Sequence, residues 1–252
     1  MRAPTLHRLP RRRRARSRPV APGTQLALPR SAGWGGRRAG AGRPRTGKAG
    51  VPHARRARVA SGDVLHVTLR TVARFRHLRT RAHGAVLRAA FQSGCDRFGF
   101  RLVHFSVQPG HLHLVAEAAS TRALSRGVKG LCIRVAKRLN RLVGRTGRVF
   151  ADRYHARAAR TPRDVRGLLV YVLQNARHHA DTRAPRRGAW IDPYSSARFF
   201  DGWSRPLAAQ GPVPDGPPPV APGKSWLLRV GWRRHGLVRP EEAPGPARAP
   251  AA

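Results

Sequence analysis

Acidic residues are scarce in this sequence. The 252 residues include 11 Asp and Glu against 51 Lys and Arg, which gives a net charge of +40. A chain this positive repels itself when compact, so we expect a polyanionic partner, and nucleic acid is the usual one. Only four basic residues are Lys. GC-rich coding also produces an arginine excess, but that origin does not change the charge.

Cysteine is nearly absent, with only Cys95 and Cys132, which lie far apart in the sequence. No Cys-x-x-Cys pair exists, which argues against a zinc finger, an iron–sulfur site or a disulfide framework. Both cysteines lie in apolar patterns with helical spacing, so we interpret them as core thiols.

Long hydrophobic runs are missing as well. No stretch of about 18 apolar residues indicates a membrane span. No apolar segment follows Arg11 to Arg14, so a secretory signal is not expected. From these features we expect a cytoplasmic protein.

Composition divides the chain into three parts. Residues 1–60 contain 17 Arg or Lys and no acidic residue, which predicts a disordered basic arm that tethers DNA non-specifically. Another interpretation is a translation start further along, since Met1 is the only methionine. Residues 61–203 carry periodic apolar patterns. In residues 204–252 Pro, Gly and Ala dominate, which predicts a mostly disordered tail, with 225–237 as a short exception.

The middle part alternates strand and helix patterns. Strands are expected over 63–70, 101–107, 111–117 and, with a bend, 149–159. Helices are expected over 83–98, 121–143 and 161–179. The last helix has a strong start in Thr161-Pro-Arg-Asp164. The pattern predicts an α+β fold, an antiparallel sheet of four to five strands with helices packed against it.

The motif His111-Leu-His113 is the first feature that indicates chemistry. On a strand, residues i and i+2 point to the same face, so these two imidazoles can share a metal ion. Two surface histidines on a half-exposed strand are the simpler interpretation of this pair.

Tyr171 and Asn175 are the second feature. They lie four residues apart in the last predicted helix and therefore on one helical face. An amide oxygen is a ligand for hard cations, so this helix can add a nucleophile and a third ligand to the His pair. A core aromatic residue and a polar residue near the helix end are the simpler interpretations.

With these residues in view, the sequence resembles the HUH single-tyrosine transposases, both the insertion-sequence-200-like transposases and the REP-associated tyrosine transposases. The resemblance covers about 60–203. It rests on Val107-Gln-Pro-Gly-His-Leu-His-Leu114, His66-Val-Thr-Leu-Arg70, Arg148-Val-Phe-Ala-Asp-Arg-Tyr-His155, Asp164 to Asn175, and Asp192-Pro-Tyr-Ser-Ser196. It is closer to the REP-associated branch, which carries Asn as the third ligand.

The resemblance implies an HUH/ferredoxin-like fold and a site made of His111, His113 and Asn175 around Mg²⁺ or Mn²⁺. Tyr171 would be the nucleophile that forms a 5′-phosphotyrosine with single-stranded DNA. There are departures from the family pattern. Gly110 replaces a common Asn before the His pair, and Gln174 beside Asn175 leaves the ligand open. Tyr154 is the rival nucleophile.

The resemblance further implies recognition of hairpin DNA by a bacterial, nucleoid-associated protein, and it allows a homodimer that exchanges tyrosine helices. The densest basic surface of the predicted helix 121–143 would contact phosphates. The residues of this surface are Arg134, Lys137, Arg138 and Arg141. Arg153, outside this helix, is a further candidate for a DNA contact. One alternative is a domesticated hairpin DNA- or RNA-binding protein that does not cleave. The other is an unrelated basic RNA-binding protein, for which the chain is poor in aromatic residues, at 6%.

Overall fold

The computed structural model describes residues 57–178, 190–207 and 216–245. Most of the predicted basic arm 1–60 lies outside these residues. The described part is built on a five-stranded antiparallel sheet with the strand order β2-β3-β4-β1-β5. Its strands are β1 (Val64–Arg70), β2 (Asp96–Arg97), β3 (Phe100–Gln108), β4 (His111–Ala118) and β5 (His155–Ala159). The predicted α+β class is confirmed.

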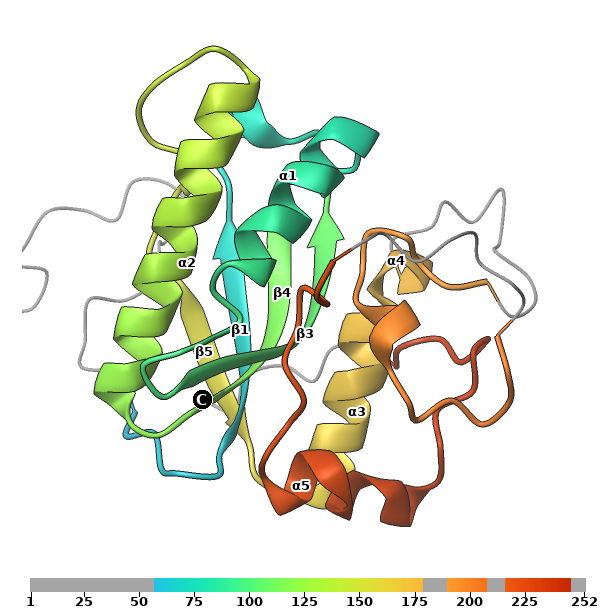
Figure 1. Cartoon of the computed structure of the whole chain (residues 1–252). Helices are drawn as coiled ribbons and strands as arrows, with labels where there is room; N and C mark the ends of the chain where they lie inside the picture. The colour runs from blue at the N-terminus through green and yellow to red at the C-terminus, as the bar shows by residue number, and fades with distance from the viewer. Residues whose placement is uncertain (1–56, 179–189, 208–215, 246–252) are drawn as a thin grey trace, which may run out of the picture. The chain divides into compact units, whose positions relative to one another are not determined.

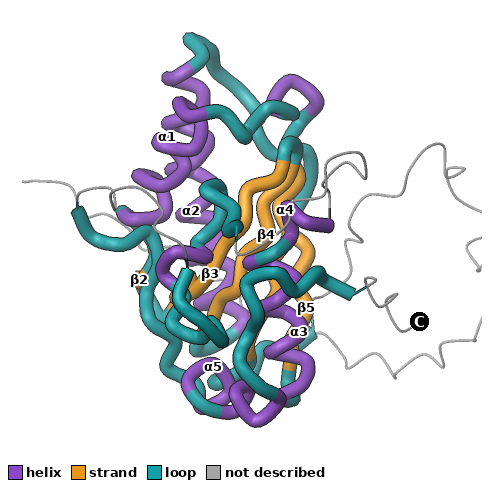
Figure 2. Tube along the Cα trace, turned by 90° about the vertical axis from the view of Figure 1, so that its right-hand side faces the viewer, coloured by secondary structure: helices purple, strands orange, loops and turns teal. Residues whose placement is uncertain are grey.

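The two faces of the sheet carry different helices (Figure 1). The helices α1 (Arg81–Gln92) and α2 (Thr121–Leu142) cover one face, and α3 (Pro162–Leu173) covers the other. Alternation along β1 explains this arrangement: Leu65, Val67 and Leu69 join the core under α1 and α2. Val64 joins the core under α3. Figure 2, seen from the side of α3, shows α3 and the short α4 in front of the strands.

A bulge in β3 keeps its large apolar residues facing the core under α1 and α2. The register of β3 against β4 shifts between Leu102 and His104. Phe100 and Leu102 before the shift, and Phe105 and Val107 after it, therefore all join the core under α1 and α2.

Two predicted elements are shorter than expected. The helix predicted over 83–98 ends at Gln92, because residues 96–97 form β2 and pair with β3. Phe98, expected on its apolar stripe, lies in the turn with a φ of 53° and is 66% exposed. The strand predicted over 149–159 is regular only from His155, after an isolated bridge between Phe150 and Thr71.

The tyrosine helix is interrupted. Thr161 caps α3 by accepting a hydrogen bond from Asp164 N, as the sequence predicted. The helix stops at Leu173, and a separate turn, α4 (Asn175–His178), follows Gln174. The side chain of Gln174 is buried and donates to Pro240 O at 2.6 Å. Its bond to the C-terminal segment accompanies the break in the helix that was predicted to be continuous.

The C-terminal segment is folded, so the prediction of a mostly disordered tail over 204–252 is wrong for residues 216–245. This segment contains α5 (Trp226–Arg229) and a 3-10 helix (Gly231–His235). Leu228, Trp232 and Val238 are buried in the core under α3. A Pro- and Gly-rich composition hides such isolated apolar residues, whose partners lie far away in the sequence. Residues 225–237 were the predicted exception.

Both chain segments after α4 protect the open edge of β3. Val107 N donates to Tyr194 O, Ser196 N donates to Phe105 O, and Ala221 N donates to Leu102 O. These bonds satisfy backbone groups that an edge strand otherwise leaves exposed. Among the described helices, none has the length and apolarity needed to cross a bilayer.

Candidate active site

A polar band crosses the sheet face that carries α3. On β4, His111 lies opposite Arg70 of β1, and His113 lies opposite Thr68. On β3, Gln108 and Ser106 flank the same two histidines. Residues directly opposite one another in a sheet share a face. The strand alternation predicted for the His pair is confirmed, and it directs both imidazoles to the α3 side.

Tyr171 comes from α3 to this band. Its ring centroid lies 5.2 Å from that of His113, and the centroids of His111 and His113 lie 4.7 Å apart. His113 is buried, whereas His111 and Tyr171 are half-buried. The structure therefore brings together three of the residues that the motifs indicated, although His113 and Tyr171 are 58 residues apart in the sequence.

His66 of β1 completes the cluster. Its Nε2 lies 3.0 Å from Nδ1 of His113, and its ring centroid lies 5.6 Å from that of Tyr171. Burial, together with the smaller effects of the Arg157 and His155 charges, lowers the pKa of His66 to about 4. At neutral pH His66 is therefore uncharged, and its Nε2 can accept a hydrogen bond from the Nδ1–H of His113.

In the sequence, His66 is notable only as the start of His66-Val-Thr-Leu-Arg70, the segment that resembles a strand of the transposase family. The alternation of 63–70 already placed His66, Thr68 and Arg70 on one face. What could not be read from the sequence is the strand order, which sets β1 between β4 and β5.

Asn175 and Gln174 differ in their side-chain contacts. Asn175 is fully buried, and neither its amide oxygen nor its amide nitrogen has a hydrogen-bond partner in the described structure. The amide of Gln174 is already bonded, donating to Pro240 O and accepting from Arg177 Nε. Buried amides normally have partners, so the unsatisfied group at Asn175 fits a ligand position for a cation.

A metal site built only from ionisable ligands does not form here. In the residues that the structure describes, no three His, Cys, Asp or Glu side chains are arranged to hold a metal ion. A set of two imidazoles and one amide is compatible with this finding.

Tyr154 lies apart from this cluster. It is buried in the core under α1 and α2, and its hydroxyl lies 3.1 Å from Ser125 Oγ of α2. The sheet separates this core from the His pair. The structure thus does not bring the rival nucleophile to the histidines.

The basic residues predicted to bind DNA also divide between two locations. Four of them belong to α2, on the sheet face opposite Tyr171: Arg134, Lys137, Arg138 and Arg141. Lys137 and Arg141 are exposed there. Arg153 precedes β5, two residues before His155, and is half-buried.

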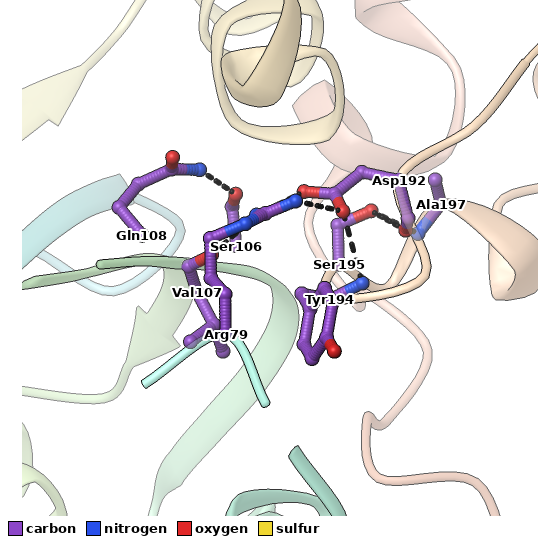
Figure 3. Close-up of polar contacts among 8 residues, drawn as sticks. All are labelled: Arg79, Ser106, Val107, Gln108, Asp192, Tyr194, Ser195 and Ala197. Carbon is purple, nitrogen blue, oxygen red and sulfur yellow. Dashed lines mark hydrogen bonds and ion pairs between the residues drawn. The ribbon is translucent and has the colours of Figure 1, made fainter. Parts of the chain in front are cut away.

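An ion pair that the sequence did not reveal anchors the chain after α4 (Figure 3). Arg79 donates to both carboxylate oxygens of Asp192 at 2.8 Å and to Val107 O at 2.7 Å. The Asp192 side chain is 1% exposed and also accepts from Tyr194 N. This bidentate pair holds the Asp192-Pro-Tyr-Ser-Ser196 motif along β3, beside Ser106 and Gln108 (Figure 3).

Comparisons with known proteins agree with the motifs. The model of the family described as Transposase IS200 like matches residues 61–172. No curated protein matches the chain. Among solved structures, the chain is similar to a REP-associated tyrosine transposase bound to a REP hairpin, with 20% identity and a TM-score of 0.47 over 66% of this chain and 95% of that one.

A Deinococcus radiodurans R1 structure described as a transposase is also similar, with 18% identity and a TM-score of 0.33 over 45% of this chain and 86% of that one. The segment 61–172, which holds the His pair and Tyr171, is similar to the family described as Transposase IS200 like, as the order of its motifs predicted.

Proposed function

We propose that this protein is a metal-dependent single-stranded DNA transposase that cleaves and rejoins DNA through a 5′-phosphotyrosine on Tyr171. The observation that carries the proposal is the position of the Tyr171 ring, 5.2 Å from the ring of His113, with His111 beside it. A phenol next to paired imidazoles provides a nucleophile and a set of ligands at one place on the sheet.

The fit of a cation rests on three side chains. His111, His113 and Asn175 would hold Mg²⁺ or Mn²⁺, and the amide of Asn175 is buried without a hydrogen-bond partner. A bound divalent cation supplies Lewis-acid polarisation of the scissile phosphate and neutralises its developing charge. Gln174 is the weaker choice of ligand, because its amide is already bonded to Pro240 and Arg177.

The step at Tyr171 balances without a further reactant. The phenolic oxygen forms a bond to phosphorus while the bond from phosphorus to the 3′ oxygen breaks. The phenol loses its proton, and the departing 3′ oxygen gains one. The phosphodiester energy remains in the tyrosine ester, so attack by another 3′-OH rejoins the strands without a nucleoside triphosphate.

The role of His66 is to position the ring of His113. Because its pKa is lowered to about 4, it is a poor acceptor for a proton from a phenol, whose pKa is near 10 in water. Its hydrogen bond to His113 instead fixes the orientation of that ring, as partners of ligating histidines do in metal sites.

The family resemblance extends the proposal to the DNA. Hairpin ends are the expected substrate, and the basic face of α2 would bind phosphates away from the cleavage site. A homodimer that exchanges α3 is not needed to complete the cluster, because Tyr171 already meets His66 and His113 of its own chain.

A covalent-adduct assay tests the proposal. The protein is mixed with 3′-labelled single-stranded hairpin DNA from the flanks of its own gene, with Mg²⁺ or Mn²⁺, and run on a denaturing gel. We expect a slow-migrating adduct that disappears with Tyr171→Phe or with EDTA. Tyr154→Phe is the matched control and should retain the adduct.

Other outcomes favour other functions. An adduct lost with Tyr154→Phe but kept with Tyr171→Phe would move the nucleophile. A salt-sensitive shift on a native gel with no adduct, for any flanking hairpin and either metal, would favour the non-cleaving binding protein.

A further inference from the structure

The outer strand β5 and the end of β1 extend the polar band with positive charge. His66 lies opposite Arg157 of β5, and Thr68 lies opposite His155. Arg70 lies opposite His111. Directly opposite residues share a face, so Arg70, His155 and Arg157 face the same side as the His pair. All three are exposed, whereas His113 is buried.

The two arginines lie beside different ends of the cluster along the strand direction. Arg157 is opposite His66, and Arg70 is four residues further along β1, which separates them by roughly 13 Å at the rise of a strand. Arg157 is close enough for its charge to lower the pKa of His66. His113, opposite Thr68, lies at an intermediate position along the strands, and the Tyr171 ring lies beside His66 and His113.

Neither guanidinium is neutralised by the described protein. The seven ion pairs of the described part involve other arginines, and neither Arg70 nor Arg157 has a side-chain hydrogen bond there. Among the strand residues of β1, β4 and β5 that face α3, the only carboxylate is Glu117. It lies at the far end of β4 and accepts from Lys224 N and Ser225 N.

From this arrangement we infer that Arg70 and Arg157 bind DNA backbone phosphates on the two sides of the bond that Tyr171 attacks. The inference rests on the proposed function and extends it. Guanidinium groups bind phosphate oxygens in bidentate fashion, and backbone contacts fix register without reading sequence. One edge of the site is then formed by Arg157, His66 and Tyr171. The other edge is formed by Arg70 and His111.

The alternative location of phosphate binding is α2, whose basic residues lie on the opposite sheet face. Contacts there can add affinity, but a strand bound only to α2 does not reach Tyr171 without crossing the sheet edge. Arg70 and Arg157 need no such path, since they share a face with the nucleophile.

The test separates binding from cleavage. In a full-length Tyr171→Phe background with EDTA, the affinity for labelled oligothymidine is measured by fluorescence anisotropy over roughly 50 to 200 mM salt. Each of Arg70→Gln and Arg157→Gln should reduce the slope of log affinity against log salt by about 0.7, the value for one phosphate contact on a single strand. Arg70→Lys and Arg157→Lys should keep the parent slope.

Arg229→Gln is the matched control, because Arg229 is also an exposed arginine, on α5. It should leave the slope unchanged. With Tyr171 restored, Arg157→Gln should slow adduct formation about 10- to 100-fold, the range for losing a hydrogen bond to a charged group. Arg157→Lys should lose less, because it keeps the charge but not the planar fork.

Slopes for Arg70→Gln and Arg157→Gln equal to those of the parent and of Arg229→Gln would overturn the inference. A failure of the proposed function is a different result: an adduct that survives Tyr171→Phe. The salt slopes are measured without cation or cleavage, so they decide the phosphate contacts independently.

Discussion

At the scale of single residues, the chemistry depends on which polar side chains are left without protein partners. Asn175 and Gln174 are neighbours of similar chemistry, yet only the Gln174 amide is bonded within the protein. The sequence alone left the choice between them open, because both lie near the end of the same predicted helix. The contact with Pro240, 66 residues away, separates them.

Removal of the Asn175 amide should weaken cation binding. We expect Asn175→Ala to lower Mn²⁺ affinity at least about tenfold by isothermal titration calorimetry, and Mn²⁺ to bind more tightly than Mg²⁺ because two of three ligands are imidazoles. Asn140→Ala, at an amide of α2, is the control and should bind Mn²⁺ like the parent. Equal Mn²⁺ affinity in Asn175→Ala and the parent would remove Asn175 from the ligand set.

The hydrogen bond between His66 and His113 should also affect Mn²⁺ affinity. His66→Phe removes the nearer partner of His113 Nδ1, leaving Thr68 Oγ1 at 3.4 Å, while keeping a ring in the site, so we expect Mn²⁺ affinity to fall about 10- to 100-fold. His66→Gln, which can still accept a hydrogen bond, should lose less. If both variants bind Mn²⁺ as the parent does, the contact is only structural.

At the scale of elements, α3 is held from two sides. The sheet lies beneath it, and the C-terminal segment lies along it. Arg166 of α3 makes a bidentate ion pair with Glu242, at 2.8 and 3.0 Å, and donates to Gly236 O and Leu237 O. Trp232, 1% exposed, packs in the same core as Val165 and Leu169 of α3. The residues that follow the family match thus support the helix that carries Tyr171.

Truncation of this support should destabilise the domain. We expect Trp232→Ala to lower the free energy of unfolding by about 3 to 5 kcal/mol, the usual range for a buried aromatic residue, in urea titrations followed by circular dichroism. Trp226→Ala is the matched control, because Trp226 of α5 is 48% exposed and its loss should cost much less. Equal losses for the two variants would mean that the C-terminal segment does not support α3.

At the scale of the whole molecule, buried neutral histidines couple stability to pH. Burial lowers the pKa of His104 to about 4, and that of His66 likewise. His104 joins β3 to the segment after α4, since its Nδ1 lies 3.1 Å from Ser196 Oγ. In the unfolded chain both groups regain a pKa near 6.5, so as pH falls the unfolded state binds these protons first.

The free energy of unfolding should therefore be highest above pH 6.5 and decrease as pH falls toward 4. Each histidine contributes up to about 1.4 kcal/mol per pH unit in that window. Urea titrations at several pH values measure the slope, and His104→Gln should remove about half of the part due to this pair. A slope that His104→Gln leaves unchanged would contradict the assignment.

The sequence alone predicted four of the five strands, most helix starts and the candidate residues of the site, because these follow from local periodicity, caps and short motifs. His111 and His113 share a face by strand alternation, and Thr161 starts α3 by capping it. The tertiary structure decided what depends on partners distant in the chain. It set β1 beside β4, so that His66 meets His113, and placed Tyr154 on the other face of the sheet. It also buried Trp232 against α3 and broke the helix before Asn175. Such contacts arise from packing and long-range hydrogen bonds, which no local pattern of residues encodes.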